Sequence, residues 1–295
     1  MQTKPITQFK KSREIGEILS DTFSFVRNNF KSLFKAIWQI CGPYFILLLA
    51  VTGYYVYEAG DFSLGDFANN STTGMSLINA NGLTGGLILS GLLLLISSLV
   101  FYAFFTATIN YYIKSYVANN GQVDLGKIKQ NVNQNWLSFL GMQIIIGLII
   151  IIGLIACVIP GIYFAVPLSL IFSVYAFQEK EIGEAFSSCF SLIKNNWWNS
   201  FLALFVMAIL VYFMNFVFQL PLIIYTVVKT LLISKTASIS DPTTLVDTVY
   251  IALNLISSTA QYLFYAIQLI CVVFVYFNLH ERKHQTGTLE KINQL

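Results

Sequence analysis

Residues Glu181–Phe201 read EIGEAFSSCFSLIKNNWWNSF, and this stretch predicts how the chain meets a membrane. Its apolar residues recur at steps of three and four, whereas its acids, serines and lysine take the opposite face, as in an amphipathic helix. Asn195 and Asn196 then interrupt the pattern, and asparagine tolerates turn conformations. The paired Trp197 and Trp198 suit the boundary between water and lipid. We therefore expect a surface helix that bends at the asparagines into a membrane-crossing helix.

The same stretch occurs earlier in the chain. Glu14–Phe34 reads EIGEILSDTFSFVRNNFKSLF, and an offset of 167 residues aligns it without a gap at ten identities in 21 positions. A weaker third copy, Asp124–Phe139, reads DLGKIKQNVNQNWLSF and is about one helical turn shorter. The chain therefore contains an internal repeat, with a predicted elbow in each copy.

Composition places the chain in a membrane. Hydrophobic residues make up 56% of it, charged residues only 11%, and the mean hydropathy is +0.68. Four cysteines are scattered without short-range pairing, which argues against a disulfide framework or a zinc ribbon. Residues 1–13 carry four cations and predict a short mobile arm.

Six apolar runs predict six membrane spans. Pro43 should kink the first span, Ile159–Gly161 should form a tight turn, and Pro221 should break or bend the fifth span. The spans are predicted at residues 36–57, 83–113, 136–158, 162–178, 198–228 and 245–279.

The predicted fold class is an all-α integral membrane protein, a single polytopic domain over residues 1–295. Three repeated units, each a surface helix followed by a transmembrane hairpin, cover about residues 14–113, 124–178 and 181–279, with a polar tail at 280–295. Of the 17 Lys and Arg, all but Lys229 and Lys235 fall in the arm, the surface helices, the loops on that side and the tail. Such loops stay cytoplasmic, so both termini are expected in the cytoplasm at a bacterial inner membrane.

Two groups of residues are candidates for contacts. The first should lie at the lipid interface and comprises Arg27, Phe30, Trp136, Lys194, Trp197 and Trp198. The second could line a polar pathway in the last two spans and comprises Asn215, Gln219, Asn254 and Gln261. Such amides more commonly hydrogen-bond between helices, and the spans hold no ionisable group of the kind that ion-coupled transport uses.

The tail begins with His280-Glu281-Arg282-Lys283-His284, a literal H-E-x-x-H zinc-protease signature. Two cations stand between the would-be ligands, and Glu290 is the sole nearby third ligand. A solvated helix end explains the same residues, so no metal, cofactor or catalytic residue is predicted.

Two groups of residues resemble the pattern of a known family of membrane domains. They are Ile159-Pro160-Gly161-Ile162-Tyr163-Phe164 and, further along, Glu184-Ala185, Ser188, Leu192, Lys194 and Trp197-Trp198. The chain resembles, over about Trp136–Phe218, the membrane domain attached to some bacterial glycerophosphodiester phosphodiesterases and its stand-alone relatives. The resemblance implies a polytopic membrane domain. It does not imply the phosphodiesterase activity, which belongs to a separate soluble barrel that this chain has no room for.

The sequence thus favours a non-enzymatic inner-membrane protein that organises or assists through contacts with membrane lipids, other membrane proteins or further copies of itself. A channel or transporter for an uncharged or lipid-like substrate is the alternative, and a zinc metalloprotease a distant third. Nothing resembles a nucleic-acid-binding module.

The charge distribution makes a topology prediction. Cysteines placed at Asn70 or Asp241 should react with a membrane-impermeant maleimide added outside the cell, whereas cysteines at Lys11, Lys129 or Lys283 should react only after permeabilisation. Labelling of position 129 from outside would mean that one hairpin has the opposite orientation, which contradicts the three-unit arrangement.

Overall fold

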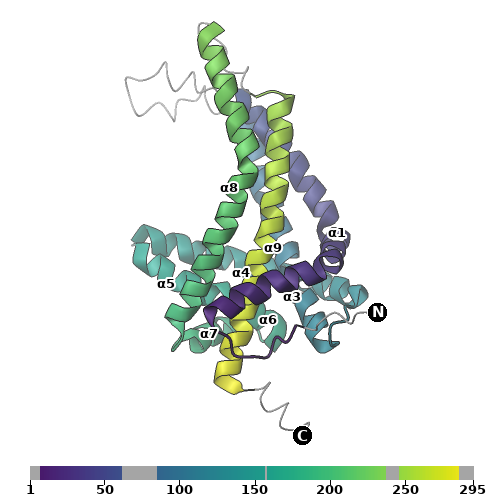
Figure 1. The fold of residues 1–295 in the computed structure, drawn as a ribbon, viewed down its shortest axis with the longest axis vertical. Helices are drawn as coiled ribbons and strands as arrows, with labels where there is room; N and C mark the ends of the chain where they lie inside the picture. The colour runs from purple at the N-terminus through teal and green to yellow at the C-terminus, as the bar shows by residue number, and fades with distance from the viewer. Residues whose placement is uncertain (1–6, 62–84, 157, 237–245, 286–295) are drawn as a thin grey trace. The chain divides into compact units, whose positions relative to one another are not determined.

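A computed structural model describes residues 7–61, 85–156, 158–236 and 246–285, and these residues form helices and no strand (Figure 1). Asn70, Asp241 and Glu290 lie outside the described residues. The helices are α1 (Ile15–Asp61), α3 (Gly85–Ala118), α4 (Leu125–Ala156), α5 (Val158–Ser169), α6 (Ile171–Gln178), α7 (Ile182–Ile193), α8 (Trp197–Thr236) and α9 (Thr248–His284).

Six segments are long and apolar enough to cross a membrane, which confirms the predicted number and gives the chain the character of a multi-pass membrane protein. Five are the single helices α1, α3, α4, α8 and α9, and the sixth is α5 together with α6. The match follows from composition, because a run of about 20 apolar residues can satisfy its backbone in lipid only as a helix.

Each copy of the repeated motif starts a helix at its acidic residue. Glu14, Asp124 and Glu181 directly precede α1, α4 and α7, and the carbonyl oxygen of each accepts the first helical hydrogen bond at 2.9–3.1 Å. The Asp124 carboxylate also accepts bonds from the amides of Gly126 and Lys127 at 3.0 and 3.2 Å. The side chain of Asp124 thus caps α4, and an acid at this position in each copy offsets the positive end of the helix dipole, so the motif is a helix start signal.

The predicted elbow occurs in only one of the three copies. Asn195 and Asn196 separate α7 from α8, whereas α1 runs on through Asn29 and α4 runs on through Asn135. In those two helices the asparagine side-chain amide donates to the carbonyl four residues earlier, at 3.1 and 2.9 Å. The elbows predicted in the first and third copies were therefore wrong, because this local bond lets asparagine remain in a helix.

Proline also interrupts the helices less than predicted. Ile159, Pro160 and Gly161 form the first turn of α5 rather than a separate tight turn, since proline is tolerated where the helical N–H groups have no partner. Helix α8 continues through Pro221 and Lys229 to Thr236, so the helix is not broken at Pro221. It ends later than the predicted fifth span, which was placed at residues 198–228. The fourth span is divided at Leu170, three residues after Pro167.

The chain divides into two compact units, residues 1–42, 102–211 and 265–295 in the first and residues 43–101 and 212–264 in the second. The three repeated units of the sequence stay a prediction. In the second unit, the ring of Phe45 in α1 lies 5.6 Å from Phe101 in α3 and 5.7 Å from Tyr262 in α9. Phe218 in α8 contacts Phe264 of α9 at 5.1 Å between ring centroids.

The core of the first unit is built around α9. Of its most apolar 18-residue stretch, 72% is buried, against 11% for α4. Phe9 stacks on Phe274 of α9 at 4.6 Å and meets Phe25 of α1 edge-on at 5.3 Å. Phe9 is only 2% exposed and Arg13 is also buried, whereas Gln8, Lys11 and Ser12 are exposed, so Phe9 fixes this segment to the core. The expectation of a mobile arm was wrong for these residues, because one aromatic side chain anchors them.

Helices α4 and α5 form a closely packed hairpin at two glycines. A Cβ atom on Gly153 would lie 3.0 Å from Gly161 Cα and 3.3 Å from its nitrogen. Small residues at such crossings let helix backbones approach closely, which is a main source of association in lipid.

We therefore predict that Gly153→Leu destabilises the protein by about 1–3 kcal/mol, the usual range for overpacking. Gly147→Leu on the same helix is the matched control, because a Cβ there meets nothing within 4 Å. Heating both variants in detergent and following the monodisperse fraction checks this. Equal loss in both would mean that the close approach does not matter.

Candidate functional site

One buried guanidinium organises the end of the first unit. The Arg13 side chain is 1% exposed, and its Nε donates to Asp21 Oδ2 at 2.7 Å. Its Nη1 donates to the carbonyl oxygens of Phe9 and Lys11 at 2.8 and 3.0 Å, and its Nη2 donates to that of Gln8. The cation also lies over the Phe274 ring, 5.1 Å from its centroid. These partners offset the cost of taking the charge out of water.

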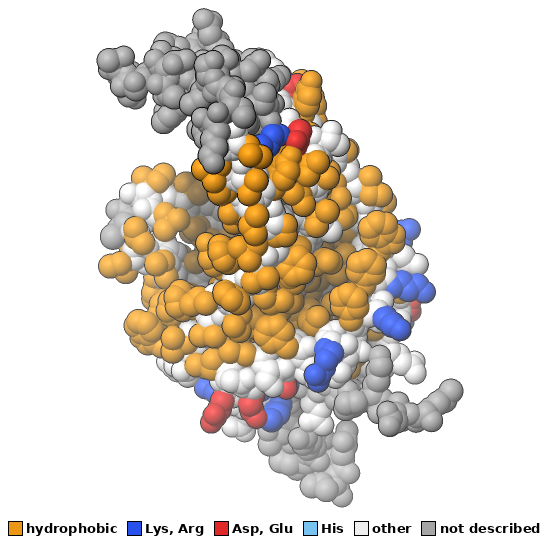
Figure 2. Space-filling model, turned by 45° about the horizontal axis from the view of Figure 1, so that its top comes forward, with side chains coloured by type: hydrophobic (Ala, Val, Ile, Leu, Met, Phe, Trp, Pro, Cys, Tyr) orange, Lys and Arg blue, Asp and Glu red, His pale blue; other side chains and the backbone are white. Residues whose placement is uncertain are grey.

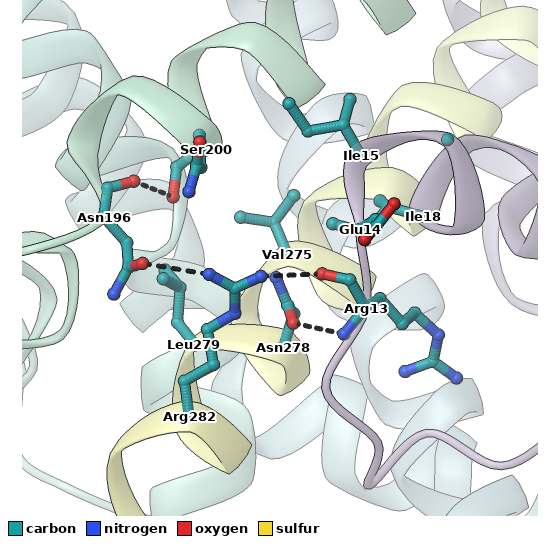
Figure 3. A pocket seen from close by; sticks show the side chains of 12 residues that line it. Arg13, Glu14, Ile15, Ile18, Asn196, Ser200, Val275, Asn278, Leu279 and Arg282 are labelled. Atoms are coloured by element: carbon teal, nitrogen blue, oxygen red, sulfur yellow. Dashed lines mark hydrogen bonds between the residues drawn. The ribbon is translucent and has the colours of Figure 1, made fainter.

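The backbone of Arg13 continues this network into two other helices. Its amide donates to Asn278 Oδ1 at 2.7 Å, and its carbonyl oxygen accepts from Arg282 Nη2 at 2.9 Å (Figure 3). Arg282 Nη1 donates to Asn196 Oδ1 at 3.1 Å. The start of α1, the elbow before α8 and the end of α9 are thereby joined. In the other copies the amide nitrogens of Asn29 and Asn135 donate back to their own helices, and Asn135 Oδ1 also accepts from the Tyr175 hydroxyl of α6 at 3.1 Å.

The same three elements enclose a cavity of about 340 Å³ (Figure 3). Its polar lining combines amides, a hydroxyl, a guanidinium and a carboxylate, which can hydrogen-bond a small polar group. The Ser200 hydroxyl donates to the Asn196 carbonyl at 2.9 Å and so supports the helix start. The lining residues are Arg13, Glu14, Ile15, Gly16, Ile18, Asn196, Asn199, Ser200, Val275, Asn278, Leu279 and Arg282.

The H-E-x-x-H stretch forms the last turns of α9. The rings of His280 and His284 lie 4.5 Å apart, and Glu281, which is 5% exposed, lines a second cavity of about 310 Å³ together with His280. Lys283 Nζ donates to Ser191 Oγ of α7 at 2.6 Å, and Arg282 contacts Asn196 as described. Among the described residues, no three His, Cys, Asp or Glu side chains gather as metal ligands would.

Lys114 links α3 to the end of α6. Its Nζ donates to the Ala176 carbonyl and to Glu179 Oε1, both at 2.7 Å. The hydrogen bond and charge of Lys114 lower the pKa of Glu179 from its usual value of 4.5. Glu179 itself adopts the left-handed conformation, φ 53°, that ends α6. The pair therefore fixes the turn between α6 and α7 and borders a cavity of about 320 Å³.

The predicted interfacial residues lie on helices, apart from Lys194 in the turn after α7, and differ in exposure. Arg27, Lys194 and Trp198 are exposed, and Trp198 is 70% exposed. Trp136 is only partly exposed because it stacks on Phe104 of α3 at 5.2 Å. Trp197 stacks on Tyr163 at 5.5 Å, so these two tryptophans also cover protein.

Two ladders of stacked rings emerge at the repeat offset of 167 residues. In α1, the centroids of Phe30, Phe34 and Trp38 are 6.0 and 6.3 Å apart in turn. In α8, those of Trp197, Phe201 and Phe205 are 5.2 and 5.3 Å apart. The sequence contains the signal for these ladders, which is an aromatic residue at positions i, i+4 and i+8. Of the six ring residues, only Phe30 and Trp197 were predicted to lie at the lipid interface.

Helix α7 does not present its apolar stripe to lipid as expected. Ala185, Cys189, Leu192 and Ile193 are buried within the protein, and burial raises the pKa of the Cys189 thiol to about 12. Phe190, on the same helix, meets Phe164 of α5 at 6.1 Å. The amphipathic pattern was identified correctly, but the stripe packs on neighbouring helices. Periodicity shows that a face is apolar and not what covers it.

The predicted pathway residues all lie in the second unit, Asn215 and Gln219 on α8 and Asn254 and Gln261 on α9. Gln219 and Gln261 are exposed, whereas Asn215 and Asn254 are partly buried. Within the described part of the chain no hydrogen bond joins the four, and the buried Asn215 Oδ1 has no partner.

Sequence reasoning missed Arg13, Asn278 and the Arg282–Asn196 bond. Each depends on a partner far away in the chain, such as the 265 residues between Arg13 and Asn278. No family model, curated protein or solved structure matches the chain. The resemblance of residues 136–218 therefore stays a prediction.

The network predicts unequal effects for two neighbouring cations. Arg13→Gln should destabilise the protein by about 3 kcal/mol, the low end for breaking a buried ion pair because the Asp21 side chain is 36% exposed. Lys11→Gln, the control, removes the exposed Lys11–Glu17 pair and should change stability by less than about 1 kcal/mol. Thermal unfolding in detergent checks both, and similar losses would contradict the role given to Arg13.

Proposed function

We propose that the protein organises or assists other components of a bacterial inner membrane through lateral contacts with lipids or membrane proteins, without an enzymatic activity of its own. The observation that carries the proposal is the apolar surface that the fold leaves uncovered. In the most apolar 18-residue stretches of α4 and α8, only 11% and 17% of the residues are buried.

Charged side chains border part of the uncovered surface. Figure 2 shows hydrophobic side chains over a broad area of the drawn face, with Lys and Arg side chains, together with some Asp and Glu, at its lower edge. A patch of this kind is rare on proteins surrounded by water and marks contact with a membrane or a partner. The border supports the proposed orientation, with the charged ends of the first unit in the cytoplasm.

The polar residues support a contact role rather than turnover of a substrate. Arg13, Asn278, Arg282 and Asn196 are engaged with one another, and Lys283 is bonded to α7. They hold the helix ends in place, so that the apolar faces are presented on a fixed frame. Passage of an uncharged or lipid-like substrate is the competing function, and it requires a route through the protein.

The proposal predicts which tryptophans touch lipid. Single-tryptophan proteins, with the other three replaced by Phe, are reconstituted in phosphatidylcholine that carries brominated acyl chains, which quench indole fluorescence on contact. Trp198, 70% exposed, should be quenched strongly, and Trp136, which stacks on Phe104, much less. Equal quenching would mean that the described packing does not set the lipid contacts.

A flux measurement on the same vesicles separates the two functions. Vesicles loaded with an uncharged sugar should retain it, and labelled phospholipid should not exchange between leaflets faster than in protein-free vesicles. Protein-dependent, saturable movement of either probe would overturn the contact role in favour of transport.

A further inference from the structure

We propose that one exposed side of α1 is a docking site for the headgroups of anionic phospholipids. This side, the basic–aromatic face, consists of Arg27, Lys31 and Lys35 beside Phe30, Phe34 and Trp38. The inference rests on the proposed function, because it names the class of lipid that the protein contacts and the place where it does so.

The helix sets both kinds of side chain in parallel lines. Arg27, Lys31 and Lys35 are spaced by four residues, so they share one side of α1 and span about 12 Å at about 1.5 Å per residue. The aromatic residues follow each cation by three positions and form the adjacent line, stacked at 6.0 and 6.3 Å. Phe30, Phe34 and Trp38 are 54%, 42% and 51% exposed.

The three cations have no carboxylate partner in the described part of the chain. All three are exposed, and no Asp or Glu oxygen there lies within 4.0 Å of them. Among the other described cations, Lys11, Lys114, Lys127 and Lys229 each pair with an acid, whereas Lys180 and Lys283 donate to serine hydroxyls. The face therefore keeps its positive charge for a ligand outside the chain, and phosphate is the anion at the membrane surface.

The second repeat provides an internal comparison. At the offset of 167 residues, Lys194 corresponds to Arg27, but Trp198 and Leu202 take the places of Lys31 and Lys35. The α8 ladder thus has the same stacked rings with one cation instead of three. Two of the cations are specific to α1 and are not needed to form the aromatic ladder.

The other side of α1 holds the face in position. Ile18, Phe25, Leu33 and Ala36 are buried at 4% exposure or less. Aromatic rings favour the level of the headgroups, and long basic side chains extend from there to the phosphates. The line of cations on this fixed helix can therefore contact an anionic headgroup, while the adjacent line of rings contacts the part of the acyl chains nearest to that headgroup.

The test uses full-length single-tryptophan proteins in vesicles of equal parts phosphatidylcholine and phosphatidylglycerol, with bromine on the chains of one lipid at a time. Trp38 lies in the face, so the ratio of its quenching by the two lipids reports which one is enriched there. We expect Trp38 to favour phosphatidylglycerol and Trp198, beside the matched ladder of α8, to show little preference. The preference should weaken in high salt, because the screening length falls from about 10 Å at 0.1 M to about 3 Å at 1 M.

Charge variants locate the effect. Lys31→Gln and Lys35→Gln should each lower the preference at Trp38 by up to about fivefold, the equivalent of about 1 kcal/mol per cation near the surface. Lys127→Gln and Lys129→Gln, each made singly at the start of α4, change the net charge by the same amount and should leave the preference intact. Both positions are exposed there, so folding should be unaffected.

The outcomes separate this inference from the proposed function. Strong but equal quenching of Trp38 by both lipids would overturn the headgroup selectivity and leave the lipid contacts standing. An equal loss of preference in the α4 variants would mean that net charge, not the face, is responsible, and would also overturn it. Absence of quenching at Trp38 together with strong quenching at Trp198 would show that protein covers the face. Absence of quenching at both would count against the proposed function itself.

Discussion

A guanidinium that leaves water needs an acceptor for each N–H group that solvent no longer reaches. In the first unit, Arg13 finds these acceptors in Asp21 and in three carbonyl oxygens of the preceding residues. Those carbonyls can converge only if residues 8–13 curl around the cation, and this curl places Phe9 against Phe274. The helix ends that border the cavity are fixed by the same residue's backbone. Packing and polar contacts at this end are thus consequences of one buried charge.

The features that the sequence predicted correctly depend on neighbours in the chain. In the described residues the six apolar runs are helical because lipid leaves the backbone no other partner, and helices begin after Glu14, Asp124 and Glu181 because an acid acts locally on the dipole of the first turn. The ladder at Phe30, Phe34 and Trp38 could also have been identified in this way, since its spacing is helical.

The features that failed depend on distant partners. The same asparagine pair ends a helix at Asn196, whose side-chain oxygen accepts a hydrogen bond from Arg282. It does not end the helix at Asn29, whose side-chain amide donates to a carbonyl of its own helix. The stripe of α7 was correctly identified as apolar, but whether protein or lipid covers it depends on where α5 and α6 lie. The two stretches share the asparagine pair and ten of 21 positions, yet they end in different local structures.

The pairing of Arg13 with Asn278 also has a consequence for biosynthesis. At about 5–20 residues per second, a ribosome needs about 13–50 s to pass from one to the other, since 265 residues separate them. During that interval Phe9 and the Arg13 amide are without their α9 partners, although the helices between them are already being inserted. Phe9 and Arg13 therefore reach their final contacts long after they are translated, and completion of the first unit waits for α9 to leave the translocon.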